Sequence, residues 1–373
     1  MIRDEEHLLA LTDAFHSAAV GAQSWHGALE GLAKATGSRS GQLIGLASDA
    51  AVVPFNLITN IDLAFHEDFV AAGGADPGRN PRVRVAAAAP ALKVLAEADY
   101  LTDDEYVRHP YIQQIASRWD VAFSCLTALE RRDGLLVRLA VLRSREEGHI
   151  TTPQREAFAA LAPHARAAVR THLSLEGQGA VFVSGAMESL SMAAFVCDRF
   201  ASVRALTPAA EALVTSARGL QLANNKLRAL NPAAGRELES AITAAASVRP
   251  PTAPLRVRTV VVPAANRHDV PLVLDVVELP VRYYDFGFAP RVLVIARGQA
   301  DDERRKMAII GAAFDLTAAE TDIAVQLSRG RNAEFIAAGR GVAVGTVRAQ
   351  IKTLLGKLGV KSQLELVAKL NKI

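Results

Sequence analysis

The pattern of hydrophobic and polar positions predicts two long stretches that mix helices with strands, followed by a purely helical tail. In residues 7–36, apolar residues recur every three or four positions, which predicts two amphipathic helices. Residues 121–129 and 135–142 are apolar and rich in β-formers, and the Asp133-Gly134 pair between them is typical of a hairpin. From about residue 317 the spacing is helical throughout. The expected fold class is therefore α+β, with two antiparallel sheets ahead of an all-α region.

The other elements of the first two stretches follow from the same patterns and from their turn residues. Thr152-Pro153 and Asn231-Pro232 each combine an N-cap with a first-turn proline, and so begin helices. In the first stretch we expect strands at 42–46 and 52–58, helices around 63–71 and 110–117, and a long helix from 152 to about 175. In the second we expect strands at 194–198 and 202–206, a helix from 207 to 215, short segments at 219–222 and 226–230, a helix from 231 to about 247, and strands at 255–262, 272–279 and 291–296. A charged connector, 299–312, is expected to be helical.

The tail predicts four short helices. Thr317 and Glu320 have the spacing of a capping box, Asn332 can cap a second helix, and Gly341 marks a tight turn before a third. That third helix, residues 344–358, is followed by a second capping-box pattern at Ser362. Two helices joined by a short turn, with the latter exposed, form the plan of a helix-turn-helix DNA reader.

The third helix has two distinct faces at 100° per residue. Its apolar stripe consists of Val344, Val347, Ile351, Leu354, Leu355 and Leu358. The opposite face carries Gly345, Ala349, Lys352, Thr353 and Gly356, with Arg348 at its border. Small residues beside cations allow a helix to approach a DNA groove closely.

Positive charge is concentrated in the tail. The whole chain has a net charge of only +3, but residues 311–373 carry nine Lys or Arg against five Asp or Glu, a net +4, so the rest carries −1. The segment from Arg340 to Lys361 holds five of these cations and no acid. Such a stretch suits a polyanion, because phosphate contacts release condensed counterions, although a solvated helix face gives the same pattern.

Composition narrows the class of protein. The chain of 373 residues is 50% hydrophobic and has no apolar run of membrane-spanning length, and its N-terminus has acids where a secretory signal needs an apolar core. We therefore expect a soluble cytoplasmic protein of several domains with no membrane partner. Cys125 and Cys197 lie in apolar strands and are expected to be buried thiols, and His164 a core or interface residue. No catalytic, metal-binding or nucleotide-binding constellation is present, so we expect no enzymatic activity, no metal and no cofactor.

The tail resembles the LuxR-type four-helix DNA-binding domain. The matching elements are Leu316-Thr317, Glu320, Gly330, Ile336-Ala337, Gly341-Val342, Thr346-Val347-Arg348, Lys357-Leu358-Gly359-Val360, Ser362 and Glu365-Leu366-Val367. The resemblance implies that Arg348, Ala349 and Lys352 face the major groove, that Thr346 contacts a phosphate, and that Lys357 contacts the DNA backbone. With Thr353 from the exposed face, the predicted DNA-binding residues are Thr346, Arg348, Ala349, Lys352, Thr353 and Lys357.

The tail departs from the family pattern at four positions. Ala343 stands where a serine usually caps the reading helix, which removes a cap worth about 1 kcal/mol. Gln350 replaces the usual histidine, Ala319 a usual basic residue, and Arg340 a common leucine. These departures leave the operator sequence and the phosphate contacts open.

The order of elements in the first two stretches resembles sensory domains. Residues 1–176 resemble a GAF-like domain and residues 177–298 a PAS-like domain, joined by the connector 299–312 to the helix-turn-helix domain 313–373. This organisation implies a homodimeric transcription regulator that binds double-stranded DNA, with a small-molecule effector or a partner acting on the sensory domains and RNA polymerase as a further candidate partner. The alternative is a constitutive DNA-binding protein whose front domains only dimerise or dock partners. An enzyme fused to a DNA reader is disfavoured by the lack of any catalytic constellation.

Overall fold

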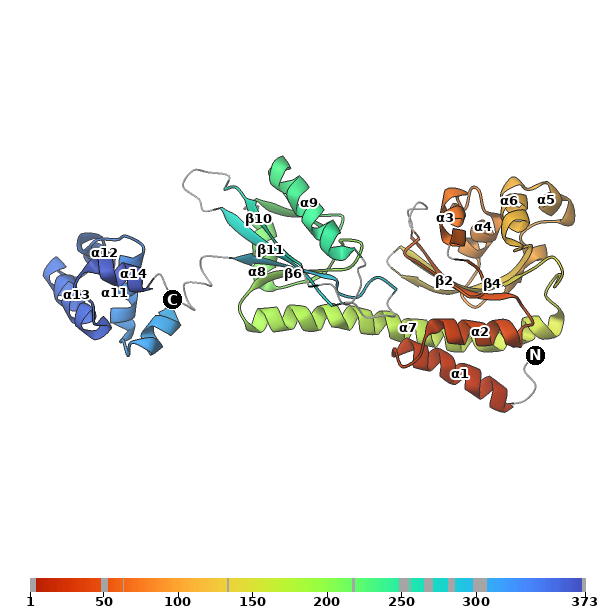
Figure 1. The fold of residues 1–373 in the computed structure, drawn as a ribbon, viewed down its shortest axis with the longest axis horizontal. Helices are drawn as coiled ribbons and strands as arrows, with labels where there is room; N and C mark the ends of the chain where they lie inside the picture. The colour runs from red at the N-terminus through yellow and green to blue at the C-terminus, as the bar shows by residue number, and fades with distance from the viewer. Residues whose placement is uncertain are drawn as a thin grey trace.

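The structure is a computed structural model that describes residues 5–47, 53–62, 64–132, 134–216, 219–247, 254, 256–264, 271–280, 286–297 and 307–370. Over these residues the protein is mixed α/β, with antiparallel sheets and a helical C-terminal region (Figure 1).

The first sheet has five antiparallel strands in the order β2-β1-β5-β4-β3. Their bounds are β1 Ser40–Ala47, β2 Phe55–Ile58, β3 Leu95–Ala96, β4 Phe123–Arg132 and β5 Leu135–Arg143. Because side chains alternate along a strand, Val137, Leu139 and Val141 of β5 pack on one face of the sheet and Ala140 and Leu142 on the other.

Helices cover both faces of this sheet. One face packs against α2 (Trp25–Ala35) and the first half of α7 (Thr152–Ser189), and α1 (Glu5–Ala19) packs on the outer side of these two helices (Figure 1). The other face packs against α3 (Ala64–Ala71), α4 (Pro81–Ala88) and α6 (Pro110–Trp119), with α5 (Asp103–Arg108) and the 3-10 turn Glu97–Asp99 beside them. The sequence patterns did not predict α4 or α5, which are short; Asn80 caps α4 and Thr102 caps α5.

The second sheet has five antiparallel strands in the order β10-β11-β12-β6-β7. Their bounds are β6 Ala193–Cys197, β7 Val203–Leu206, β10 Val257–Val262, β11 Leu272–Glu278 and β12 Val292–Arg297. One face packs against α8 (Pro208–Thr215), α9 (Pro232–Ala246) and the hairpin of β8 (Leu220–Ala223) and β9 (Lys226–Ala229), and the other against the second half of α7. If the strands of each sheet are numbered 1 to 5 in chain order, leaving out the β8–β9 hairpin, both sheets have the strand order 2-1-5-4-3.

Helix α7 passes beneath both sheets as one continuous helix of 38 residues (Figure 1). The expectation that it ends near Leu175 is wrong, because Gly177 and Gly179 lie inside it. A Cβ on Gly179 would lie 3.3 Å from Cδ of Pro290, so glycine lets the loop before β12 approach the helix closely. A glycine inside a helix lowers its stability by about 1 kcal/mol relative to alanine, and the close packing of Pro290 against Gly179 offsets this loss.

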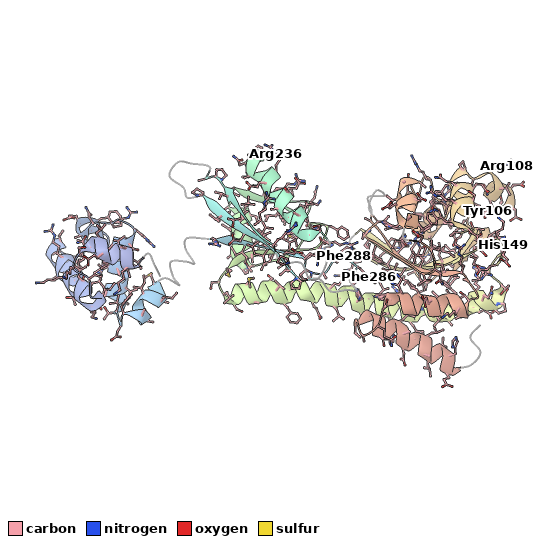
Figure 2. All side chains as sticks on the ribbon, in the orientation of Figure 1. Tyr106, Arg108, His149, Arg236, Phe286 and Phe288 are labelled. Atoms are coloured by element: carbon pink, nitrogen blue, oxygen red, sulfur yellow. The ribbon has the colours of Figure 1, made fainter. Side chains whose placement is uncertain are left out.

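The same loop joins the second sheet to the core of the first. Phe286 is fully buried and stacks on Phe55, with ring centroids 4.2 Å apart, while Trp25 lies 5.3 Å away. The backbone N–H of Phe286 donates to Oε1 of the buried Glu176 on α7 at 2.6 Å. Figure 2 shows Phe286 and Phe288 between the two sheets, above α7. This aromatic plug couples the packing of the two parts.

The C-terminal region is helical throughout its described residues. Its helices are α11 Ala318–Ser328, α12 Ala333–Arg340, α13 Val344–Leu358 and α14 Gln363–Leu370. Residues 307–313 are also helical and add the buried Ile310 to the same core. The start of the predicted connector, residues 299–306, lies outside the described residues. The four predicted tail helices are confirmed, and Thr317 and Glu320 form the predicted capping box.

Cys125 and Cys197 are buried free thiols, as predicted. Burial raises the pKa of each to about 12, so both stay protonated and inert at neutral pH. His164 is half-buried on α7, with its ring centroid 6.4 Å from that of His16 on α1, as an interface histidine would be.

Candidate nucleic-acid interface and a buried cationic cavity

Helix α13 presents the predicted DNA-binding face to solvent. Val347, Ile351, Leu354 and Leu358 are buried in the core of the helical region and fix the orientation of the helix. All six predicted residues are exposed: Thr346, Arg348, Ala349, Lys352, Thr353 and Lys357. The structure therefore places these six side chains on the outward part of one helix.

The approach to α13 is a tight turn. Helix α12 ends at Gly341, whose φ of +64° lies in the left-handed region that suits glycine. Ala343 is the N-cap of α13 and makes no side-chain hydrogen bond, so the missing cap predicted from the sequence is confirmed. The side chain of Ala343 therefore accepts no hydrogen bond from the first backbone N–H groups of α13. These N–H groups and the positive end of the helix dipole favour an anion at the start of the helix.

Several cations of the acid-free segment have acidic partners in space. Nη2 of Arg348 lies 2.7 Å from Oε1 of Glu334 on α12, and Nζ of Lys357 lies 2.8 Å from Oε2 of Glu320 on α11. Arg340 contacts Gln350 at 3.3 Å and lies 3.9 Å from Asp322, so two departures from the family pattern contact each other. The charge that looks unopposed in the sequence is thus partly neutralised by α11 and α12.

The two acids that hold these cations are strongly ionised. The hydrogen bond from Lys357, together with those from Thr317, lowers the pKa of Glu320 to about 2. A backbone hydrogen bond and the Arg348 guanidinium hold the pKa of Glu334 below its usual range. The Arg348–Glu334 pair is exposed on both sides and therefore weak, so a phosphate can compete for Arg348, whereas the Glu320 side chain is only 12% exposed.

A second site lies inside the first sheet part, between the sheet and α3, α4 and α6. It is a cavity of about 30 Å³. Its walls are largely apolar or aromatic, and its polar groups include two buried arginines; the lining consists of Gln42, Ile44, Phe65, Phe69, Asn80, Arg82, Tyr111, Ile115, Val121, Ser124, Leu126, Arg138, Ala140 and Leu142. The sequence patterns did not identify this site.

The first arginine, Arg82, is fully partnered. Its Nε donates to Oε1 of the buried Glu97 at 3.1 Å, and its Nη2 donates to the carbonyl of Ala122 at 2.7 Å. The other carboxylate oxygen of Glu97 accepts from N and Oγ of Ser124 at 3.0 and 3.2 Å. Although burial opposes its charge, the pKa of Arg82 is raised because Glu97 stabilises the charged form. This is a complete buried ion pair.

The second arginine, Arg138 of β5, is 4% exposed and has no carboxylate partner among the described residues. Its Nε and Nη1 atoms are buried without any hydrogen-bond acceptor. Burial lowers the pKa of Arg138 to about 10. A β-bulge in β4 lies beside it, since Ala128 pairs with Arg138 whereas Glu130 already pairs with Val137. Bulges of this kind commonly accompany functional sites.

Two more arginines are buried among the described residues, Arg143 and Arg291, and both differ from Arg138 because they donate to backbone carbonyls. Nη2 of Arg291 donates to the carbonyl of Ser247 at 3.4 Å, while its Nη1 has no acceptor.

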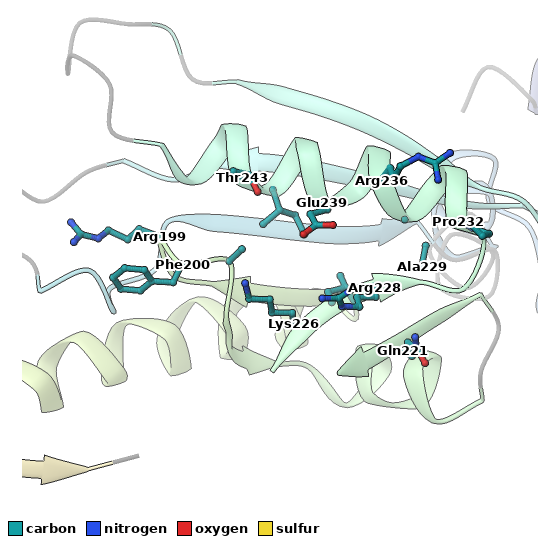
Figure 3. Close-up of a pocket in the computed structure, with 14 residues that line it drawn as sticks. Arg199, Phe200, Gln221, Lys226, Arg228, Ala229, Pro232, Arg236, Glu239 and Thr243 are labelled. Atoms are coloured by element: carbon teal, nitrogen blue, oxygen red, sulfur yellow. The ribbon is translucent and has the colours of Figure 1, made fainter. Parts of the chain in front are cut away.

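A larger hollow of about 540 Å³ lies on the second sheet part, between α9 and the β8–β9 hairpin (Figure 3). Lys226, Arg228, Arg236 and Glu239 line it and are exposed to solvent. Because water reaches these side chains freely, their charges cost little to leave without a ligand.

None of the described helices is both long and apolar enough to span a bilayer. No group of three or more His, Cys, Asp or Glu side chains within the described ranges is arranged to hold a metal ion.

No family model matches the sequence, and no curated protein matches it. Among solved structures, the VqsR LBD domain from Pseudomonas aeruginosa is 12% identical, with 45% of this chain and 95% of that chain covered and a TM-score of 0.34. The phage VqmA–DPO complex is 16% identical over 50% of this chain and 87% of that one, and the E. coli DhaR(N)–DhaL complex 13% identical over 79% and 87%; both have a TM-score of 0.23. These scores describe a weak similarity and do not establish a shared fold or function.

Proposed function

We propose that the protein is a DNA-binding transcription regulator whose C-terminal region reads duplex DNA as a LuxR-type helix-turn-helix domain. The observation that carries this proposal is the exposed face of α13, where Arg348 and Lys352 flank the small residue Ala349. A helix with small side chains at its centre and cations at its borders fits a major groove. Thr346, Thr353 and Lys357 are proposed to contact the DNA backbone or the groove edge.

We propose that the two sheet parts regulate this reader as GAF-like and PAS-like sensory domains, residues 1–176 and 177–298. Their five-stranded antiparallel sheets with helices on the faces support that assignment. The continuous helix α7 and the Phe286 plug give one part a mechanical connection to the other. A ligand can use such a connection only through different affinities for two states of the protein.

We further propose that the protein acts as a homodimer, because two-fold symmetric proteins match two-fold symmetric operators. Val181 and Phe182 of α7 are large apolar side chains left exposed, with Phe182 74% exposed, and they are candidates for self-association.

The alternative is that the front domains only dimerise or dock partners and sense nothing. The cavity with its unpartnered Arg138 favours the sensory proposal, because a domain that serves only for docking gains nothing from an uncompensated buried charge.

Selection of the full-length protein on a library of random duplexes tests the proposal. We expect enrichment of a sequence with two related half-sites, separated by about one helical turn or a multiple of it. The double variant Arg348→Ala, Lys352→Ala should enrich no sequence. The matched control is the double variant Lys226→Ala, Arg228→Ala, which removes the same charge from β9 and should behave like the wild type. Failure of the wild type to enrich any duplex would contradict sequence-specific DNA binding.

A further inference from the structure

We propose that the cavity of the first sheet part is a binding site for a small monocarboxylate, whose carboxylate pairs with the guanidinium of Arg138. As an effector site this deepens the proposed function and rests on it, whereas binding to the cavity does not depend on DNA.

The hydrogen bonds of the cavity leave one buried cation without an acceptor, which indicates that the cavity binds an anion. Nε and Nη1 of Arg138 are buried without acceptors, and a buried cation without a partner is expensive enough that proteins rarely keep one. Arg82, on the same cavity wall, cannot share its partner, because the carboxylate of Glu97 is used by Arg82 and Ser124. One positive charge therefore remains for a ligand to neutralise.

The charge balance favours a monoanion. With Arg82 and Glu97 cancelling each other, Arg138 supplies a single uncompensated charge among the lining residues. A carboxylate matches this charge and the planar fork of a guanidinium, whereas a phosphate dianion would bury one excess negative charge.

A second donor is available beside Arg138. The hydroxyl of Tyr111 accepts from Nδ2 of Asn80 at 3.2 Å, which leaves its own hydrogen for a ligand oxygen. Gln42 also lines the cavity, and one of the two hydrogens on its Nε2 is donated to Oδ1 of Asn56 at 2.7 Å.

The dimensions and walls limit the rest of the ligand. A volume of about 30 Å³ holds about two water molecules, which is the space needed for a carboxylate and little more. Phe65, Phe69 and Ile115 provide apolar surface on α3 and α6 for a short hydrocarbon tail. These features select the shortest carboxylic acids, acetate ahead of propionate and butyrate.

Isothermal titration of the full-length protein without DNA tests this site. The probes are sodium acetate, propionate and butyrate, compared with sodium chloride and sodium phosphate at equal ionic strength. We expect saturable binding of at least one carboxylate and no saturable binding of chloride or phosphate.

Three variants complete the test. Arg138→Met should weaken carboxylate binding at least tenfold, Arg138→Lys should retain part of it, and Arg84→Met, which removes the same charge from the exposed face of α4, should bind like the wild type. A thermal melt shows whether Arg138→Met is folded. If it is not, Arg138→Lys provides the test, because it keeps the positive charge but loses the planar guanidinium and should therefore bind carboxylate more weakly than the wild type.

Equal binding by the wild type and Arg138→Met, or equal binding of phosphate and carboxylate, would overturn the assignment, as would no saturable binding of any carboxylate. If carboxylate binds through Arg138 but leaves the affinity for a selected duplex unchanged, the site stands and the sensory part of the proposed function fails.

Discussion

The cavity of the first sheet and the exposed face of α13 each depend on arginine, but they treat its charge in opposite ways. Arg138 is buried and has no acidic partner among the described residues, whereas Arg348 is exposed and has one, Glu334, at 2.7 Å. Solvation alone would favour the opposite arrangement, because water stabilises an exposed cation without a partner, whereas a buried cation needs a counterion.

The difference indicates what each site does with an anion. A buried unpaired charge is costly at all times, so its persistence points to a ligand that compensates it. An exposed ion pair is weak, so Glu334 opposes the proposed DNA binding only slightly, as a competitor for Arg348 that a phosphate can displace.

The largest expected effect comes from breaking the partnered arginine of the cavity. Arg82→Met leaves the carboxylate of Glu97 buried without its cation, and we expect it to lower the free energy of unfolding by about 3–5 kcal/mol. Urea denaturation followed by circular dichroism measures this. Arg84→Met on the same helix is the control, and its change should stay within about 0.5 kcal/mol. A small effect of Arg82→Met would show that Glu97 is not held as a buried ion.

The unpartnered arginine should respond with the opposite sign. Arg138→Met replaces an uncompensated buried charge by an apolar side chain, and we expect the ligand-free protein to gain about 1 kcal/mol or more in stability. The same denaturation experiment measures it, in a buffer without carboxylates. Destabilisation as large as that of Arg82→Met would mean that Arg138 already has a compensating partner.

The smallest effect is expected at the exposed pair. Glu334→Gln removes the acid that competes for Arg348, and we expect the affinity for a selected duplex to rise about twofold at moderate salt. Fluorescence anisotropy measures the change, and Glu365→Gln on α14 serves as a charge-matched control. A loss of affinity would show that the pair orients Arg348 for DNA.

The local patterns predicted most of the elements, because hydrophobic period and capping chemistry act over a few residues. The caps at Thr317 and Asn332, the hairpin after Arg132, and the strands of both sheets follow from neighbouring side chains alone, except for the two-residue strand β3, which no local pattern marked. The strand order and the pairing of distant strands depend on contacts far apart in the sequence, and local patterns do not contain them.

Helix α7 shows how a local signal fails. Gly177 and Gly179 indicate a helix end, yet the helix continues to Ser189. Gly179 is explained by packing, because Pro290 lies where a larger side chain at residue 179 would stand, whereas no atom would crowd a side chain at residue 177. That packing partner is more than a hundred residues away in the chain.

The candidate sites divide in the same way. The α13 face was predictable because one helix supplies all six residues. The acids that pair with its cations were not, because Glu320 and Glu334 come from other helices. Arg138 carries one usable signal, since the alternation of β5 places this lone charge on the same face as Ala140 and Leu142. The missing partner is visible only in three dimensions.

The most direct test of the central claim is the salt dependence of duplex binding by the full-length protein and by its Arg348→Ala, Lys352→Ala variant. We expect the variant to bind a selected duplex at least about tenfold more weakly than the wild type, and the slope of log affinity against log salt to fall in magnitude by about 2. The variant with Lys226→Ala and Arg228→Ala should keep the affinity and slope of the wild type. Unchanged affinity and slope in the α13 variant would contradict the claim that this helix reads DNA.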